Sequence, residues 1–304
     1  MKRIKLIYNP ISGDGGFKNE LDLVIKNFQE NGYLVEMLRT DKNGMECDFF
    51  NQSISSWENT IIVVAGGDGT VSQVVNIMIK NQIQSPLGVI PMGTANDLGS
   101  YLGMSRNIEE CCKTIIENNQ IKMDIGMIND NYFISVASGG LVATVPQATD
   151  VRLKNTLGKL AYYLKGLEEI PTFRPISISL ESPDYQYEGE LLFFLILNGQ
   201  FAGGFKKIAP RASIIDGKFD VILFKNSNLP VLARLFVKLL RGEHINDPNV
   251  IFFQTNELVI KPYCNKNSIM IDVDGEAGPI LPLFIKNKSK SISMIVSEDR
   301  KDKI

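Results

Sequence analysis

The sequence is poor in the residues that mark metal-binding and disulfide-rich proteins. Its 304 residues include four cysteines and a single histidine. The cysteines form no C-x-x-C pair, and two of them, Cys111 and Cys112, are adjacent, a spacing that suits neither a metal site nor a disulfide. We therefore expect reduced thiols, as in a cytoplasmic protein.

An excess of one charge and long apolar runs are missing as well. With 32 basic and 34 acidic side chains, the formal net charge is -2. Nucleic-acid-binding domains are usually clearly basic, so we expect no nucleic-acid partner. No stretch approaches the roughly 18 uninterrupted apolar residues of a membrane span, and the apolar run after the basic start is too short for a signal peptide. We expect a cytoplasmic protein that contacts membranes only peripherally.

The length and the hydrophobic pattern predict two domains. A chain of 304 residues is too long for one average core. In residues 1–126, apolar strand-like segments without clean alternation are separated by helix-like segments. This pattern indicates an α/β domain with a doubly wound parallel sheet that is covered on both faces. The predicted strands are 4–8, 33–38, 59–65 and 87–90.

The pattern changes near residue 127 to short strands linked by turns, which predicts a mostly-β antiparallel domain over 127–290. Residues 291–304 form a C-terminal strand and tail that could pack on the first domain. Two helices are expected, Leu153–Leu167 and Leu229–Arg241, and we interpret their apolar stripes as core-facing rather than membrane-binding. The predicted strands are 131–137, 176–180, 188–197, 219–224, 257–261, 268–273 and 292–296.

The clearest local signal is Gly66-Gly67-Asp68-Gly69-Thr70, between a predicted buried strand and a predicted helix. Glycines let the backbone turn sharply and approach an anion, which the amides at the start of the helix then favour. A carboxylate such as Asp68 does not bind phosphate directly, so it indicates an intervening Mg²⁺. The sequence has no G-x-x-x-x-G-K-[ST] and no G-x-G-x-x-G ending on glycine, which disfavours P-loop and nicotinamide-dinucleotide sites.

Two more loops follow predicted strands of the same sheet. In Pro91–Asp97, Thr94 offers a hydroxyl, and Asn96 and Asp97 can cap the next helix. The turn Asn9–Gly13 ends the first strand. Ligands bind where the carboxyl ends of parallel strands meet the following loops, so we expect all three loops to line one nucleotide site.

The second half contains two acidic motifs, each with two interpretations. Asp216-Gly217 is either a plain turn or part of a metal site, and Ile271–Glu276 is either a hairpin turn or the source of a catalytic carboxylate. His244 follows the helix predicted at 229–241, and we expect it at the surface or capping the helix. Asp124, at the predicted domain junction, joins either a Mg²⁺ network with the carboxylates of the first domain or a salt bridge.

In order and spacing, Asn9-Pro10-x-Ser12-Gly13, Gly66–Thr70 and Gly93–Asp97 resemble the diacylglycerol-kinase catalytic domain family. That family includes bacterial soluble lipid kinases, sphingosine kinases and ceramide kinases, and the similarity runs over nearly the whole chain. Gly-Gly-Asp-Gly-Thr is shared with NAD kinases and phosphofructokinases, whereas Gly-Thr-Ala-Asn-Asp distinguishes the lipid kinases. The resemblance implies an α/β domain followed by a β-sandwich domain, with the active site in the cleft between them.

The resemblance also implies roles for individual residues. Glu276, in Asp-Gly-Glu, matches the catalytic base of the family. The side chain of Asp216 and the backbone carbonyls of Ser213 and Lys218 match a structural Mg²⁺ site, although relatives usually have apolar residues at these two flanking positions. The implied ATP-binding residues are Asn9, Thr40, Gly66, Gly67, Asp68, Gly69, Thr70, Val71, Ser72 and Thr94.

The function implied by this resemblance is an ATP- and Mg²⁺-dependent lipid kinase that acts on a lipid hydroxyl at the membrane surface. Diacylglycerol, giving phosphatidic acid, is the leading substrate, and sphingoid bases, undecaprenol and phosphatidylglycerol stay open. One alternative is an NAD kinase-like enzyme, and another is a catalytically silent nucleotide- or lipid-binding regulator. Homodimer formation also stays open.

Overall fold

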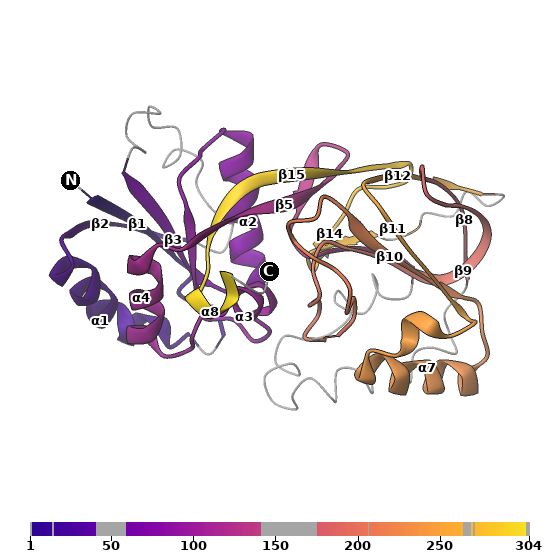
Figure 1. The fold of residues 1–304 in the computed structure, drawn as a ribbon, viewed down its shortest axis with the longest axis horizontal. Helices are drawn as coiled ribbons and strands as arrows, with labels where there is room; N and C mark the ends of the chain where they lie inside the picture. The colour runs from indigo at the N-terminus through magenta and orange to yellow at the C-terminus, as the bar shows by residue number, and fades with distance from the viewer. Residues whose placement is uncertain are drawn as a thin grey trace. The chain divides into compact units, whose positions relative to one another are not determined.

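The computed structural model describes residues 2–13, 15–40, 59–140, 175–205, 207–263, 269 and 271–301. The chain divides into two compact units. The first unit comprises Met1–Asp124 and Ser289–Ile304, and the second comprises Ile125–Lys288. The chain therefore passes between the units twice, once within β5 and once within β15 (Figure 1).

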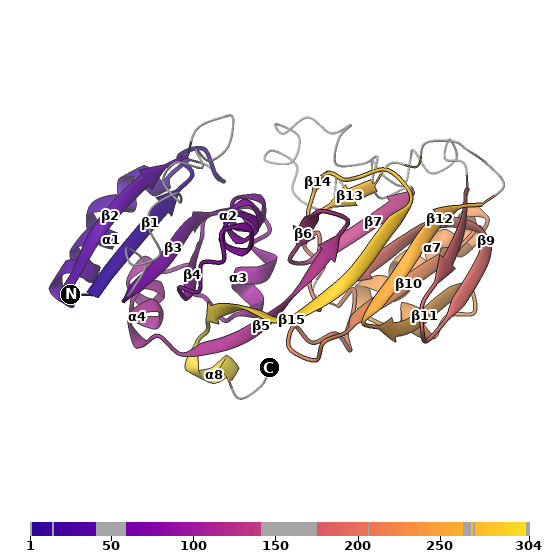
Figure 2. The ribbon, with the colours of Figure 1, turned by 90° about the horizontal axis from the view of Figure 1, so that it is seen from above.

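The first unit is built on a parallel sheet. Strands β2, β1, β3 and β4 are neighbours in that order, and the end of β15 lies parallel to β4, where Met294 pairs with Leu87 (Figure 2). The steps from β1 to β2 and from β3 to β4 run in opposite directions along the sheet, so right-handed crossovers place α1 and α2 on opposite faces. The elements are β1 (Lys2–Tyr8), α1 (Phe17–Glu30), β2 (Tyr33–Arg39), β3 (Thr60–Gly66), α2 (Asp68–Lys80), β4 (Leu87–Pro91), α3 (Asp97–Tyr101), α4 (Ile108–Glu117), β5 (Gln120–Ile128), β15 (Leu283–Ile295) and α8 (Glu298–Lys301).

Local sequence signals account for these elements. Every residue of β3 is buried, as expected for a central strand covered on both faces. Helix α1 buries Phe17, Val24 and Phe28 at helical spacing, and α4 begins where the side chain of Asn107 accepts a hydrogen bond from the amide of Glu110 at 3.0 Å. The predicted doubly wound α/β domain is confirmed.

The second unit is a mostly antiparallel β structure, which confirms the predicted fold class. Strands β9 and β10 are buried on both faces: Phe194 and Ile196 belong to one hydrophobic cluster, and Leu195 and Leu197 to another. Because both faces are buried, the two strands contain nearly continuous runs of apolar residues. The elements are β6 (Asn131–Phe133), β7 (Val136–Gly140), β8 (Ile176–Glu181), β9 (Gln186–Leu197), β10 (Phe219–Lys225), α7 (Leu229–Arg241), η4 (His244–Asn246), β11 (Val250–Thr255), β12 (Glu257–Pro262), β13 (Ile271–Val273) and β14 (Glu276–Ala277).

Helix α7 has the predicted bounds, but the prediction for the neighbouring histidine is wrong. His244 is fully buried, its Nε2 lies 2.8 Å from the carbonyl oxygen of Ile208, and its ring is nearly parallel to that of Phe224. Burial lowers the pKa of His244, which favours the neutral ring. The helix predicted at Leu153–Leu167 lies outside the described residues. None of the helices described here is long and apolar enough to cross a membrane.

Candidate active site

Three loops of the first unit meet at one edge of its sheet, because β1, β3 and β4 are parallel and adjacent. Hydrogen bonds join the loop after β1 to the glycine-rich segment. The Asn9 side-chain amide donates to the Thr70 hydroxyl at 3.1 Å, and the Gly67 amide donates to Ser12 Oγ at 3.3 Å. The structure therefore brings together residues that are more than fifty positions apart.

The glycines of these loops differ in what surrounds them. A Cβ on Gly93 would lie 2.5 Å from the Cα of Gly67, and a Cβ on Gly66 would lie 2.7 Å from the Cβ of Thr70. Contacts within the protein therefore require glycine at positions 66 and 93. A Cβ on Gly69, in the first turn of α2, would meet nothing within 4 Å. Gly69 is the position in this segment that faces open space.

Two carboxyl groups lie close together at the starts of α2 and α3. Asp68 Oδ1 accepts a hydrogen bond from the amide of Leu98 at 3.3 Å, and Asp97 is buried. Burial raises the pKa of Asp68 to about 6, and the nearby charge of Asp97 adds to this effect. Two neighbouring carboxyl groups supply the oxygen atoms that Mg²⁺ prefers as ligands.

The loop after β4 differs from expectation at one position. Asn96 occupies the residue before α3 in the left-handed conformation, with φ of 53°, but its side chain does not cap the helix. Its amide group instead bonds to Gly93, accepting from the backbone amide and donating to the carbonyl, both at 2.6 Å. The predicted capping role of the Asn96 side chain is wrong, since the side chain closes its own loop.

The remaining candidate ATP-binding residues lie in different surroundings. Thr40 is buried beside the end of β1, where its amide donates to the carbonyl of Tyr8 at 2.9 Å. Its hydroxyl has no hydrogen-bond partner within the described part of the chain. Val71 is buried, so only its backbone is available to a ligand, whereas Ser72 is half-buried and Thr94 is exposed.

Asp216 in the second unit forms a local turn. Its Oδ1 accepts a hydrogen bond from the amide of Lys218 at 2.9 Å, and its side chain is exposed. Nearby Asp220 is buried and accepts from the side chain of Gln254 at 2.7 Å, and burial together with the charge of Asp216 raises the pKa of Asp220 to about 6. Within the described ranges, no cluster of three or more His, Cys, Asp or Glu residues could hold a metal ion. Ser213 lies in the same loop and is half-buried.

Glu276 begins β14, in a tight hairpin where Val273 pairs with it across the turn. Its side chain is exposed. Asp272 stabilises the turn, because its Oδ1 accepts a hydrogen bond from the amide of Gly275 at 3.0 Å. Both interpretations of this motif are therefore compatible with the structure, since a well-formed turn presents the carboxylate.

Asp274 has a role that sequence reasoning missed. Its carboxylate accepts hydrogen bonds from three successive backbone amides, those of Ile134, Ser135 and Val136, at 2.7, 2.9 and 3.0 Å. The side chain of Asn198 holds the same segment by donating to the carbonyl of Ile134 at 3.0 Å. No local signal in the sequence indicates this contact, because an Asp-Gly pair resembles an ordinary turn.

Asp124 accepts a hydrogen bond from the amide of Lys290 at 2.7 Å, within the first unit. This contact ties the end of the first long segment of that unit to its C-terminal strand. The hydrogen bond to a backbone amide was not among the interpretations of the sequence. It shows that Asp124 helps to hold β5 and β15 at the point where both enter the first unit.

The fold and these loops define a two-unit protein whose first unit has a candidate site at a glycine-rich sheet edge. The family model described as the diacylglycerol kinase catalytic domain matches residues 3–128, and the model described as the YegS C-terminal NAD kinase beta sandwich-like domain matches residues 135–296. The chain belongs to the diacylglycerol kinase family.

Similar proteins agree over their full lengths. The chain is 35% identical to a diacylglycerol kinase of Bacillus subtilis, covering 100% of this chain and 99% of that protein. It is 36% identical to a diacylglycerol kinase of Staphylococcus aureus strain MRSA252, covering 98% and 93%. The crystal structure of a diacylglycerol kinase from Bacillus anthracis superposes with a TM-score of 0.79 at 24% identity, covering 98% of both chains, which supports the fold.

Proposed function

We propose that this protein is an ATP- and Mg²⁺-dependent lipid kinase that phosphorylates the hydroxyl of diacylglycerol to give phosphatidic acid. The observation that carries the proposal is the meeting of three loops at the sheet edge, with open space over Gly69. Relatives of full length are named diacylglycerol kinases, which supports diacylglycerol as the acceptor.

The first unit is suited to hold ATP. Gly67, the residue before α2, provides no side-chain cap, so the first amides of the helix are available to phosphate oxygens, and the helix dipole favours negative charge there. The open face at Gly69 leaves room for the phosphates. The buried hydroxyl of Thr40, at the end of the neighbouring strand, is available to the adenosine side.

Two oxygen-rich places are proposed for Mg²⁺. Asp68 and Asp97 would hold the catalytic ion, which, when bound, would neutralise phosphate charge, and the charge of Asp97 close to Asp68 supports this assignment. Asp216, with the carbonyls of Ser213 and Lys218, would hold a structural ion. Buried Asp220 lies close enough for the charge of Asp216 to add to the effect of burial on its pKa, so two carboxyl groups are near one another here, which supports this second assignment.

Glu276 is the proposed general base. Phosphoryl transfer needs mainly positioning and charge neutralisation, together with one group that accepts the proton of the attacking hydroxyl. An exposed carboxylate on a hairpin whose turn is held by Asp272 and Asp274 suits that task. The oxygen of the lipid hydroxyl bonds to the γ-phosphorus, the bond to ADP breaks, and Glu276 carries the released proton.

The proposal is tested with ATP labelled in the γ-phosphate and separate detergent-dispersed acceptors. Diacylglycerol, a sphingoid base, undecaprenol and phosphatidylglycerol are compared, and NAD is offered without lipid. We expect label in phosphatidic acid. Label only in NAD, or in no acceptor, would overturn the assignment, and label in another lipid would correct the substrate.

A matched variant tests where ATP binds. Gly69→Ala meets no atom of the protein and lies in a helix, where alanine is favoured over glycine by up to about 1 kcal/mol. Its melting temperature should therefore be equal to that of the wild type or higher, while the KM for ATP rises because the new methyl group occupies the phosphate space. An unchanged KM would place the nucleotide elsewhere.

A further inference from the structure

Helix α7 is apolar on two opposite sides. Leu232 and Leu235 face inward and belong to the hydrophobic cluster beneath the helix. On the other side, Val237 and Leu240 are 48% and 53% exposed. Ala233 is also exposed and lies on the same face, one helical turn before Val237. An ordinary surface helix has one apolar stripe that faces the core. Packing among the described residues of the unit therefore does not explain the outward apolar face of α7.

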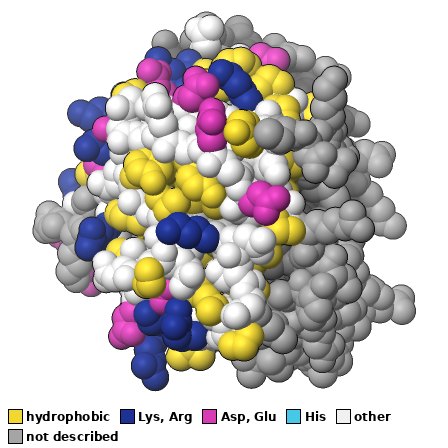
Figure 3. All heavy atoms as spheres, turned by 90° about the vertical axis from the view of Figure 1, so that its right-hand side faces the viewer, with side chains coloured by type: hydrophobic (Ala, Val, Ile, Leu, Met, Phe, Trp, Pro, Cys, Tyr) yellow, Lys and Arg dark blue, Asp and Glu magenta, His cyan; other side chains and the backbone are white. Residues whose placement is uncertain are grey.

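The basic residues of α7 gather along one edge of this outward face. Arg234, Lys238 and Arg241 follow one another at spacings of four and three residues, and the helix contains no acidic residue. In the space-filling view, hydrophobic and basic side chains lie next to one another at the lower edge of this side of the second unit, where α7 lies in Figure 1 (Figure 3).

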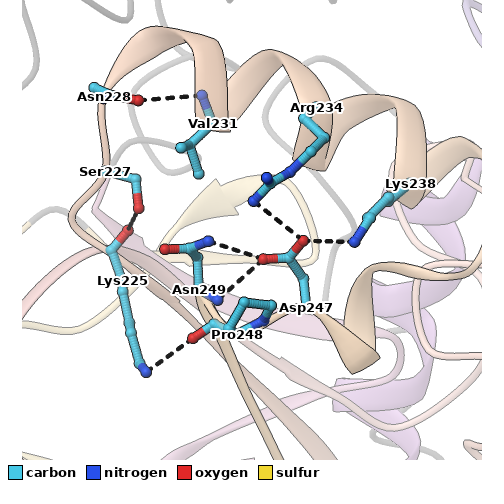
Figure 4. A network of polar contacts seen from close by, with 9 residues as sticks. All are labelled: Lys225, Ser227, Asn228, Val231, Arg234, Lys238, Asp247, Pro248 and Asn249. Carbon is cyan, nitrogen blue, oxygen red and sulfur yellow. Dashed lines mark hydrogen bonds and ion pairs between the residues drawn. The ribbon is translucent and has the colours of Figure 1, made fainter.

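A buried carboxylate holds two of these cations in place. Asp247 lies 2.7 Å from Lys238 Nζ and 3.4 Å from Arg234 Nη2, and the amide of Asn249 donates to its other oxygen (Figure 4). The single carboxylate of Asp247 pairs with both Arg234 and Lys238, so these two cations and Arg241 together have more positive charge than the carboxylate neutralises. The ion pairs hold the two cations in place in the absence of a partner.

From this geometry we propose that the outward face of α7 docks on an anionic lipid surface. A rigid helix with exposed aliphatic side chains and a basic edge is the pattern of a helix that lies in a membrane interface, with its apolar side among the acyl chains and its cations at the phosphates. The helix ends support a preformed structure, since the Asn228 side chain caps the first turn at 3.2 Å and Gly242 ends the helix at φ of 77°.

The charge argues for lipid rather than for a second copy of this chain. A two-fold contact pairs the same patch with itself, so it would bring two basic edges together across a small apolar stripe. Two large aliphatic side chains are also few beside the roughly 20–30 residues a side of a stable interface. The docking proposal rests on the proposed function, because a kinase that acts on a membrane lipid must reach the bilayer.

The test measures binding to vesicles without ATP and without diacylglycerol, by sedimentation with vesicles of pure phosphatidylglycerol or pure phosphatidylcholine. The wild type should bind phosphatidylglycerol in preference, and added salt should weaken this binding. The double variant Val237→Glu, Leu240→Glu should bind phosphatidylglycerol vesicles about tenfold more weakly or worse, and Arg241→Glu should also bind more weakly.

Two control variants introduce the same kinds of substitution at exposed positions of the first unit. Met37→Glu alters an apolar side chain that is 52% exposed on β2, and Lys113→Glu reverses a cation that is 78% exposed on α4. Both should bind as the wild type does, and melting temperatures should show that all variants fold. Turnover of detergent-dispersed diacylglycerol should be unchanged in the α7 variants, because the bilayer is absent from that assay.

Three outcomes would overturn the docking proposal. They are failure of the wild type to bind phosphatidylglycerol vesicles, equal binding by the α7 double variant, and conversion of a dimer to a monomer by that variant in sedimentation velocity. The last would identify a second copy as the occupant. Loss of vesicle binding in the variant, in a protein that phosphorylates no lipid, would support docking and reject the proposed activity.

Discussion

The two units build their candidate site parts in different ways. In the first unit, backbones come into contact: Gly67 and Gly93 leave no room for a side chain between them, so loops from different strands lock together. In the second unit, carboxylates hold turns, as Asp274 does with three amides. A glycine motif therefore reports close approach of backbones, whereas an acidic motif mixes residues that support the structure with residues that are exposed to a substrate.

The comparison predicts that one carboxylate of the second unit matters for chemistry rather than for structure. Glu276→Gln should keep the hairpin, which is formed by backbone pairing, and should lower kcat by about 10²–10⁴-fold because the general base is lost. Turnover of the lipid acceptor and the melting temperature are measured together. Glu188→Gln, an exposed change on β9, is the control. A wild-type kcat in Glu276→Gln would reject the role.

A second prediction separates a metal ligand from a plain turn. If Asp216 holds Mg²⁺, the ion should raise the melting temperature of the wild type without ATP, since a ligand at 100 times its Kd stabilises the folded state by about 2.7 kcal/mol. Asp216→Ala should lose this increment, and Glu276→Gln should keep it. Thermal unfolding with and without Mg²⁺ decides the matter, and equal increments in wild type and Asp216→Ala would show that the turn binds no ion.

The buried carboxyl group of the first unit predicts a pH effect. The folded chain keeps a proton on Asp68 up to about pH 6, whereas the unfolded chain releases it near pH 4. Stability should therefore fall as the pH rises through this window, by about 3 kcal/mol. Asp68→Asn should unfold with a higher free energy than the wild type at pH 7.5, and the difference should vanish near pH 3.5.

Urea titrations at the two pH values measure this difference, with the exposed change Asp130→Asn as the control. The same Asp68→Asn variant should bind Mg·ATP less well, so stability and nucleotide binding change in opposite directions. A gap in stability that is equal at both pH values would mean that the charge of Asp68 costs nothing in the folded protein.

The smallest expected effect concerns the support of Glu276. Asp274→Ala leaves three backbone amides without their acceptor, which costs roughly 1–2 kcal/mol where water has partial access. It should also lower kcat without changing the KM for ATP, since the proposed nucleotide site lies in the other unit. Asp274→Asn tolerates the left-handed backbone, with φ of 51°, and isolates the carboxylate. A KM effect as large as the kcat effect would contradict this positioning role.

Features with local causes were predicted from the sequence. Helix α7 has the predicted bounds, because hydrophobic spacing, the cap at Asn228 and the stop at Gly242 are all local. The doubly wound sheet followed by antiparallel strands was likewise readable from its apolar runs. Only 292–296 of β15 was predicted, although its first residues alternate between buried and exposed positions, with Leu283, Ile285 and Asn287 buried.

Features with distant causes were not predictable. Asp274 finds its donors 138 to 140 residues earlier in the chain, and His244 is buried by a carbonyl and a ring from other segments. Asn96 looked like a cap, and it bonds instead to Gly93, three residues back, because the left-handed turn directs its side chain there. For Asp274 and His244, the folded backbone determines the partner, and the neighbouring residues in sequence do not specify it.

The division of the first unit has a consequence for how the protein is made. Its sheet includes the end of β15, where Met294 pairs with Leu87, so the unit holds both the earliest and the latest segments of the chain. During synthesis, residues 2–124 leave the ribosome long before residue 294. The edge of β4 therefore has no β15 partner until the whole second unit has been made. The glycine-rich loops thus belong to a sheet that is completed only after nearly the whole chain has been made.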